Sequence, residues 1–391
     1  MQIGFAHITS VQASKTVQCF ILNSNMKSFY SILFGVFAVS LSAQVPLTKM
    51  CSLPKVCNES SGVVLGKHNT IWTNNDSGDK PVLYQVNRNG ELLRQVYIKN
   101  ALGIDIEELA LQQDKFIYVA DIGNNSNDRK SLSIYKIKAN QLYAKDSVEG
   151  EVIAFHYPDQ LDFPPQRSDK NFDCEAFFWY KHKLYLFSKN RGKSLYTKIY
   201  TLPDVAGNYT ATLVDSFFCG GWVTSADINP SKNTVALVSS ASVYLIPFSK
   251  KGVFNKEKTV HFSLPSSQLE AIAFKDDSTL WLTDEKNCPY DGNLYEVKLG
   301  TIKTVAHPLL HFSVPQYPQN ESFYISYNGT ASDTVQFSIV DSQNVTIKSF
   351  SLAVSTRYAK EVNLAEFKEC KYTLHFKSET YEEVYDVEYR K

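Results

Sequence analysis

Short apolar strands and polar turns alternate along this chain in a unit that recurs five times. Each unit begins with an apolar strand, turns into a second strand, and ends with a polar loop and a strand that carries a tyrosine. These tyrosines are Tyr84, Tyr135, Tyr200, Tyr244 and Tyr295. Self-similarity at a period of roughly 50 residues is typical of the four-stranded blades of a β-propeller.

Each unit also leaves room for a fourth, outer strand, as in residues 91–98, 151–157 and 259–264. A single four-stranded blade cannot bury both of its faces, whereas a ring of blades buries each against its neighbours. We therefore predict an all-β chain with a β-propeller over residues 45–312. Five blades are expected, and six are the alternative if the long second unit hides another blade or the termini share one. A generic all-β sandwich with chance similarities is the competing interpretation.

Residues 313–391 follow a different pattern. The segment 314–320 reads VPQYPQN, which is typical of a linker, and short strands with alternating apolar positions follow it. Val335, Phe337 and Ile339 show this alternation, which is expected of half-buried strands. We predict a small C-terminal β-sandwich as a second domain.

The N-terminal region carries an export pattern that starts at Met26. Lys27 is followed by the apolar stretch 32–41 and by small residues ending at Ala43. This order is typical of a signal peptide, so we expect residues 1–43 to comprise an upstream extension and a signal peptide, with a mature start near residue 44. A membrane anchor or a buried helix is the alternative. We expect a secreted or cell-surface protein with no transmembrane segment after signal cleavage.

Composition narrows the class of partner. Lysine plus arginine and aspartate plus glutamate each number 40, so the formal net charge is zero. A nucleic-acid-binding protein would usually show a basic excess, so no nucleic-acid partner is expected. The 23 tyrosines and 24 phenylalanines favour pleated, half-buried surfaces. An extracellular protein, a glycan or a small molecule remains as the expected partner.

Propeller geometry brings the start of each innermost strand and the loop after each second strand to one face, around the mouth of the central channel. Acidic residues recur at the strand starts, where Glu107 stands next to Glu108, and Asp105 and Asp173 lie beside this set. The candidate metal ligands are Glu59, Glu108, Glu175, Glu270 and Asp227, the last standing near Ser225 where a glutamate is missing. Clustered carboxylates repel one another unless a cation neutralises them, and Ca²⁺ or another divalent cation prefers such oxygen ligands.

The polar loops on the same face supply candidate ligand-binding residues. These are Asn75, Asp76, Asp121, Asn124, Asn125, Lys189, Arg191 and Asp284. Lys189, Arg191 and Arg129 could instead pair with the acids. Structural roles remain open as well, because strand-start glutamates can accept hydrogen bonds from backbone amides and Asn, Asp and Gly suit tight turns. A catalytic pair of carboxylates is the third interpretation.

Several segments resemble motifs of exported bacterial β-propeller proteins, many of which carry a C-terminal sorting domain for type IX secretion. The segments are WTNNDSG (72–78), DIEELA (105–110), YVADIGNNSNDR (118–129), DCEAF (173–177) and VTSADINP (223–230). Residues 315–391 resemble a divergent sorting domain in which SYNGT (326–330) replaces the usual opening. The resemblance implies a propeller fold and export.

More distantly, the propeller is similar to gluconolactonase-type lactonases and phytase-like esterases. Those proteins use acidic residues and a divalent cation at the channel mouth, which implies roles for Glu59, Glu108, Glu175 and Glu270 here. The chain lacks a G-x-S-x-G nucleophile elbow and a P-loop, so no nucleophile can be named. Two hypotheses follow: an exported binding or scaffold module with an acidic, Ca²⁺-binding mouth, and a metal-dependent hydrolase of an ester, lactone or phosphoester.

Overall fold

The computed structural model describes residues 45–301 apart from 77, 195, 220–221, 230, 240–241, 265–268 and 286–291, and then 312–313, 322–328, 333–354, 357–363, 367–368, 370–378 and 382–389. The predicted signal peptide, the upstream residues 1–25 and the linker 314–320 lie outside this description. Every helix in the described ranges is a short 3-10 turn, and the rest of the regular structure is strand, which confirms the all-β prediction. The 3-10 helices are η1 (Lys55–Cys57), η2 (Lys67–Asn69), η3 (Ala139–Tyr143), η4 (Arg167–Asp169), η5 (Lys256–Lys258) and η6 (Leu299–Thr301).

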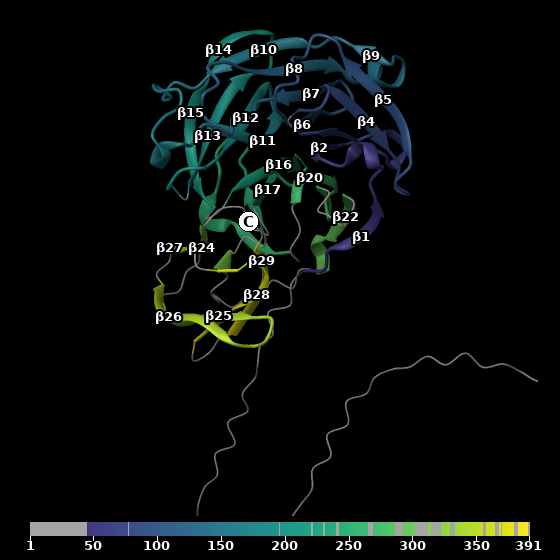
Figure 1. Cartoon of the computed structure of the whole chain (residues 1–391). Coiled ribbons are helices and arrows are strands. Elements are labelled where there is room, and N and C mark those ends of the chain that lie inside the picture. The colour runs from purple at the N-terminus through teal and green to yellow at the C-terminus, as the bar shows by residue number, and fades with distance from the viewer. Residues whose placement is uncertain are drawn as a thin grey trace, which may run out of the picture. The chain divides into compact units, whose positions relative to one another are not determined.

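Five sheets follow one another along the first three quarters of the chain (Figure 1). The first contains β2 (Ser60–Leu65), β3 (Ile71–Asn75), β4 (Val82–Val86), β5 (Leu92–Ile98) and β9 (Ser147–Val148). The second contains β6 (Ile106–Gln112), β7 (Phe116–Asp121), β8 (Leu132–Lys138), β10 (Glu151–His156) and β14 (Gly207–Thr210). The third contains β11 (Asp173–Tyr180), β12 (Lys183–Lys189), β13 (Tyr196–Pro203) and β15 (Thr212–Phe218). The fourth contains β16 (Val223–Asn229), β17 (Thr234–Ser239), β18 (Ser242–Pro247) and β19 (Val260–Ser263). The fifth contains β20 (Leu269–Asp276), β21 (Thr279–Asp284), β22 (Asn293–Lys298) and β1 (Thr48–Ser52).

The five sheets form a closed ring. The first strand of each sheet packs against the first strand of the next, and β20 packs against β2 to complete the circle. Figure 1 shows β2, β6, β11, β16 and β20 on the inner side of their sheets. A separate hydrophobic core fills each interface between neighbouring sheets, such as the one where Trp72 meets Ile117 and the one where Trp281 meets Val63. This arrangement confirms the predicted β-propeller, and five blades remain our interpretation of it.

Strands exchanged between units join the ring together. β1 pairs antiparallel with β22, so an N-terminal strand completes the last sheet. β9 lies parallel to β5, although it comes from the chain after β8, and β14 lies parallel to β10, although it comes from the third unit. The second unit is therefore long because it contains β9, η3 and η4, and its described residues form no additional sheet.

The C-terminal region forms two further sheets among its described residues. One contains β23 (Phe312–Ser313), β24 (Ser322–Asn328) and β27 (Arg357–Asn363), and the other contains β26 (Thr346–Val354), β25 (Asp333–Asp341), β28 (Cys370–Lys377) and β29 (Glu382–Tyr389). Val335, Phe337 and Ile339 are fully buried, so the alternation read from the sequence is confirmed. Across the described parts of the whole chain, no helix is long and apolar enough to cross a membrane.

Candidate functional site

A β-bulge interrupts the first strand of every sheet close to its start. The register with the second strand shifts there in all five sheets. The residues left without a partner are Ser61 and Gly62 in β2, Glu107 in β6, Glu175 in β11, Thr224 in β16 and Glu270 in β20. A bulge re-aims side chains that a regular strand would point to alternate faces. The repeat is therefore aligned on Glu107, Glu175 and Glu270, whereas the sequence pattern aligned Glu108 with the last two.

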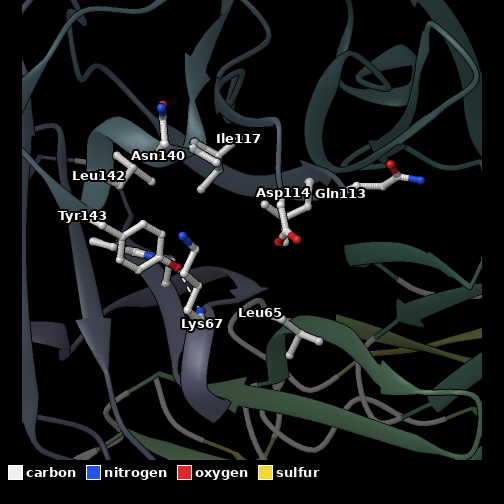
Figure 2. A pocket seen from close by; sticks show the side chains of 11 residues that line it. Leu65, Lys67, Gln113, Asp114, Ile117, Asn140, Leu142 and Tyr143 are labelled. Carbon is white, nitrogen blue, oxygen red and sulfur yellow. Dashed lines mark hydrogen bonds between the residues drawn. The ribbon is translucent and has the colours of Figure 1, made fainter.

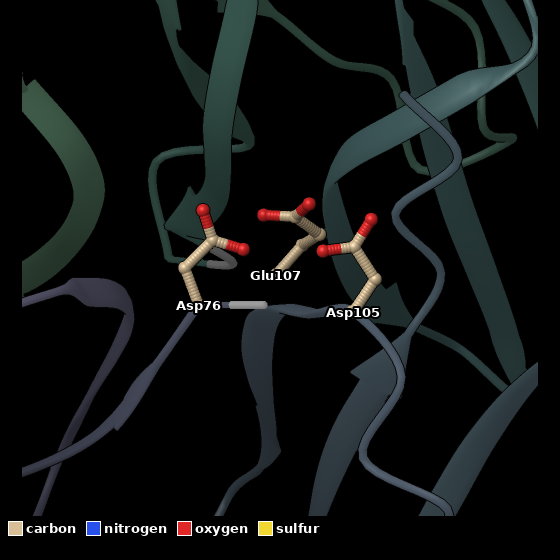
Figure 3. A group of neighbouring side chains, drawn as sticks. All are labelled: Asp76, Asp105 and Glu107. Carbon is tan, nitrogen blue, oxygen red and sulfur yellow. The ribbon is translucent and has the colours of Figure 1, made fainter. Parts of the chain in front are cut away.

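Three carboxylates from two sheets converge beside these bulges. Asp76 follows β3, Asp105 precedes β6, and Glu107 is the bulged residue of β6. One oxygen from each lies within 4.8 Å of the others, and Figure 3 shows the three carboxylates side by side. We call these three residues the mouth cluster. Glu107 also belongs to a second group of the same kind, with Asp173 and Glu175 of β11.

Two oxygens of the mouth cluster are buried without a hydrogen-bond partner. Asp105 is 6% exposed and Glu107 is 2% exposed, yet Oδ1 of Asp105 and Oε1 of Glu107 have no partner. A buried carboxylate oxygen normally has a donor, so orphaned oxygens of this kind need an explanation such as an ion. Gly123 borders the same two carboxylates, because a Cβ at that position would lie 2.3 Å from both Oδ2 of Asp105 and Oε1 of Glu107. The chain keeps this space free of side-chain atoms.

The mouth cluster is short of positive charge. Burial raises the pKa of Asp105 to about 7, with the charges of Asp76 and Asp173 adding to the effect. Burial likewise raises the pKa of Glu107 well above its ordinary range, and Glu175 and Asp76 add repulsion. A bound cation would reverse this balance, because it favours the charged carboxylates. The donors are all hard oxygens, which suit Ca²⁺, Mg²⁺ or Mn²⁺.

Basic side chains form ion pairs with the neighbouring acids. Arg191 donates from Nε to Oδ2 of Asp173 and from Nη2 to Oε1 of Glu175 at 3.0 Å, and Lys189 donates to Oε2 of Glu175. Burial alone would lower the pKa of Lys189, but Glu175 and Glu270 outweigh it and raise the pKa. The pairing of Lys189 and Arg191 with the acids, which the sequence left as one of two alternatives, is therefore observed.

Glu108 lies apart from the mouth cluster and spans the channel. Its Oε2 accepts hydrogen bonds from the Ser225 hydroxyl and, at 3.4 Å, from the Ala226 N–H, while Oε1 accepts from the Leu109 N–H at 2.9 Å. β6 and β16 are not neighbours in the ring, so this side chain joins two blades across its centre. The Ser225 hydroxyl in turn accepts from the Ile272 N–H at 3.0 Å. Glu108 thus takes the structural role that the sequence left open for strand-start glutamates.

Of the other predicted metal ligands, Glu175 belongs to the second group, whereas Glu59, Asp227 and Glu270 lie outside both groups. Glu59 is exposed, and its carbonyl accepts from the Asp76 N–H at 2.9 Å. Asp227 accepts from the Phe274 N–H at 2.7 Å, and burial raises its pKa to about 7. Burial also raises the pKa of Glu270, against the opposing charge of Lys189. Glu285, which the sequence pattern did not single out, has a pKa raised to about 8 by burial and by Glu270.

The predicted ligand-binding residues mostly hold the loops of the mouth. Asp121 accepts from the N–H groups of Ile104 and Asp105 and pairs with Arg129 at 2.8 Å. Asp284 accepts from the Asn293 N–H at 2.6 Å and from the Tyr295 hydroxyl at 2.7 Å. Further residues of this set are tied similarly, namely Asn124 to Asp173 and Phe172, Asn125 to Arg191, and Asn75 to Val56 and Asp79. Asp76 alone of these residues joins the mouth cluster.

The sequence pattern placed Asp105 and Asp173 beside the acidic set and named Glu108 rather than its neighbour Glu107 as a metal ligand, and it did not single out Gly123. A usable signal was present, because Asp105 and Glu107 share the D-x-E spacing of Asp173 and Glu175. That spacing reflects the bulge, since the residue after the first aspartate pairs with the second strand and the glutamate does not.

A pocket at the opposite ends of the strands is too small for an organic ligand. It lies between the first two sheets and is lined by residues that include Trp72, Leu65 and Tyr143, the last two of which are labelled in Figure 2. Its volume of about 30 Å³ would hold roughly a water or two. The Tyr143 hydroxyl accepts there from Nε1 of Trp72 at 3.1 Å, so we assign this pocket to blade packing.

Comparisons with known proteins give distant likenesses only. No protein-family model matches the chain, and no curated protein matches it. The PQQ-bound aldose sugar dehydrogenase from Streptomyces coelicolor is similar in structure at 10% identity, with a TM-score of 0.39 over 66% of this chain and 99% of that one. A candidate gluconolactonase is similar at 11% identity, with a TM-score of 0.37 over 62% and 74%. A candidate 6-phosphogluconolactonase from Bacteroides uniformis is similar at 13% identity, with a TM-score of 0.33 over 78% and 88%.

Proposed function

We propose that this protein is an exported propeller that binds a divalent cation, Ca²⁺ in the first place, at its channel mouth. It would act as a binding or scaffold module for an extracellular protein, glycan or small molecule. The observation that carries the cation site is the pair of buried, unpartnered oxygens on Asp105 and Glu107, in a cluster of three carboxylates. The export pattern from Met26 supports a location outside the cytoplasm.

The dimensions of the mouth cluster suit Ca²⁺. Calcium takes oxygen ligands at about 2.3–2.6 Å, so two ligands on opposite sides of the ion lie up to about 5 Å apart. The three carboxylates of the mouth cluster offer oxygens within 4.8 Å of one another. Mg²⁺ binds at about 2.0–2.1 Å and demands a tighter octahedron, so it should bind more weakly.

Calorimetric titration of the mature protein, from residue 44 onward, tests this proposal. We expect one Ca²⁺ per chain and a higher melting temperature in Ca²⁺ than in EDTA, because an ion that binds only the folded state at 100 times its dissociation constant stabilises it by about 2.7 kcal/mol. Glu107→Gln should abolish both effects. Glu151→Gln, at an exposed position of β10, is the matched control and should retain them. Absence of Ca²⁺, Mg²⁺ and Mn²⁺ binding by a folded wild-type protein would refute the cation site.

A metal-dependent hydrolase is the second candidate function. The same three carboxylates support it, because a divalent cation that they hold could act as a Lewis acid on an ester, lactone or phosphoester oxygen. A screen of lactones, esters and phosphoesters distinguishes the two candidates. Turnover that EDTA and Glu107→Gln both abolish would assign the protein to the enzymes, and no turnover on any of these classes supports the binding module.

A further inference from the structure

The second acidic group, Glu107 with Asp173 and Glu175, has the dimensions of a cation site but already has its positive charges. All four carboxylate oxygens of Asp173 and Glu175 accept from donors. Oδ1 of Asp173 accepts from the Asn124 N–H at 2.6 Å, and Oδ2 accepts from Nε of Arg191. The two oxygens of Glu175 accept from Nη2 of Arg191 at 3.0 Å and from Lys189. Asp173 and Glu175 are therefore satisfied without a metal ion.

The mouth cluster differs on this point. Oδ1 of Asp105 and Oε1 of Glu107 have no hydrogen-bond partner, and no lysine or arginine in the described chain forms an ion pair with either residue. Arg129, whose charge acts to lower the pKa of Asp105, forms its ion pair with Asp121 instead. Lysine and arginine thus neutralise Asp173 and Glu175, whereas Asp105 and Glu107 have no such ion pair in the described chain.

The two basic side chains are fixed parts of the site. The side chains of Lys189 and Arg191 are only 11% and 22% exposed. Both lie over the ring of Trp222, at 5.5 Å and 5.1 Å from its centre, and Arg191 also donates to Asn125 of the neighbouring blade. Partly buried charges that are held by several contacts act as permanent local charges rather than as mobile surface groups.

From these contacts we infer that Lys189 and Arg191 take the place of a second divalent cation, so that the mouth binds one cation and not two. The inference rests on the proposed cation site. Arg191 and Lys189 already occupy both oxygens of Glu175 and one oxygen of Asp173, and the Asn124 N–H occupies the other. A second cation between Glu107, Asp173 and Glu175 would have to displace these donors, whereas a cation in the mouth cluster meets oxygens of Asp105 and Glu107 that have no partner.

Counting bound ions in a double variant tests the inference. Wild type should bind one Ca²⁺ in equilibrium dialysis, and Lys189→Met with Arg191→Met should bind two, because the freed oxygens of Asp173 and Glu175 then face Glu107. Mn²⁺ in place of Ca²⁺ should show spin coupling between two ions only in the double variant. Lys198→Met is the matched control, since Lys198 forms its ion pair with Asp159, at 2.7 Å, and none with Asp173 or Glu175. The Lys198→Met variant should still bind one ion.

The single variant Lys189→Met covers the case in which the double variant does not fold. Arg191 still contacts both Asp173 and Glu175 there, and removal of one positive charge should tighten the first Ca²⁺ about ten-fold. A folded double variant that binds one ion, a single variant with unchanged affinity, or a wild type that binds two would each overturn the inference. A wild type that binds no cation would instead refute the proposed function on which the inference rests.

Discussion

Gly123 shows how closely the mouth depends on single residues. Its missing side chain leaves free the space that borders Oδ2 of Asp105 and Oε1 of Glu107. Contacts of 2.3 Å from a Cβ are far shorter than ordinary van der Waals distances, so any larger residue must displace these carboxylates. No torsional requirement explains this glycine, because its backbone does not have the positive φ seen at Gly78, Gly90 and Gly103.

Gly123→Ala should therefore weaken Ca²⁺ binding by about 100-fold or more, because two ligands are displaced at once. Titration calorimetry measures the change, and circular dichroism checks the fold. Gly300→Ala is the control, since a Cβ there meets no atom within 4 Å, and it should leave the affinity unchanged. Wild-type affinity in folded Gly123→Ala would contradict the placement of the cation beside Asp105 and Glu107.

Asp227 provides a pH test that does not involve the mouth cluster. Burial raises its pKa from the ordinary 3.8 to about 7, so the folded state binds the proton more tightly than the unfolded state does. Its contribution to stability is present below about pH 4 and is lost as the pH rises towards 7. Asn at this position can still accept from the Phe274 N–H, which Asp227 does at 2.7 Å.

Asp227→Asn should consequently raise the free energy of unfolding at pH 8 and change it little at pH 4. Since Asp227 is partly exposed, we expect a gain of about 1 kcal/mol at pH 8. Urea unfolding of both proteins in EDTA at several pH values measures the difference. A gain of the same size at both pH values would show that the charge of Asp227 is not its source.

At the scale of the strand, the bulge explains why the sequence pattern aligned Glu108, rather than Glu107, with Glu175 and Glu270. The apolar pattern identified the first strand of each sheet, because the side-chain period is visible in the sequence. Blade topology then indicated that these strands all start on one face. A bulge adds one residue that the period does not reveal, so Glu107 and not Glu108 stands at the position that corresponds to Glu175 and Glu270. The two adjacent glutamates then have separate roles.

This separation predicts opposite behaviour for Glu107→Ala and Glu108→Ala. Glu107→Ala should abolish Ca²⁺ binding and change stability in EDTA little, because it removes a repelled carboxylate. Glu108→Ala should leave the Ala226 N–H and the Ser225 hydroxyl without their shared acceptor and open a cavity, at a loss of about 2–4 kcal/mol. Calorimetry and urea unfolding measure both quantities, and loss of Ca²⁺ binding in a folded Glu108→Ala protein would contradict the assignment.

At the scale of the whole molecule, the sequence period predicted the ring of sheets but not the strand pairing that closes it. The five repeat tyrosines all lie on third strands, as the period indicated. Pairing between β1 and β22 joins residues far apart in sequence, and neither strand carries a local pattern that names its partner. The same holds for β9 and β14, which are short and join sheets that begin in other units.

Deletion of residues 45–52 tests the importance of this closure. Each lost backbone hydrogen bond of β1 contributes about 0.5–1.5 kcal/mol, and Val45, Leu47 and Met50 pack into the cores on either side of the fifth sheet. We expect the truncated protein to lose at least about 3 kcal/mol in urea unfolding. An unchanged urea midpoint would show that the ring closes without β1.

The most direct test of the central claim is a crystal structure of the mature protein grown with Mn²⁺, with anomalous scattering used to locate the ion. We predict one anomalous peak per chain, within coordination distance of carboxylate oxygens of Asp76, Asp105 and Glu107. Lys189 and Arg191 should still be bound to Asp173 and Glu175. A peak elsewhere, or a mouth that shows only water at saturating Mn²⁺, would contradict it.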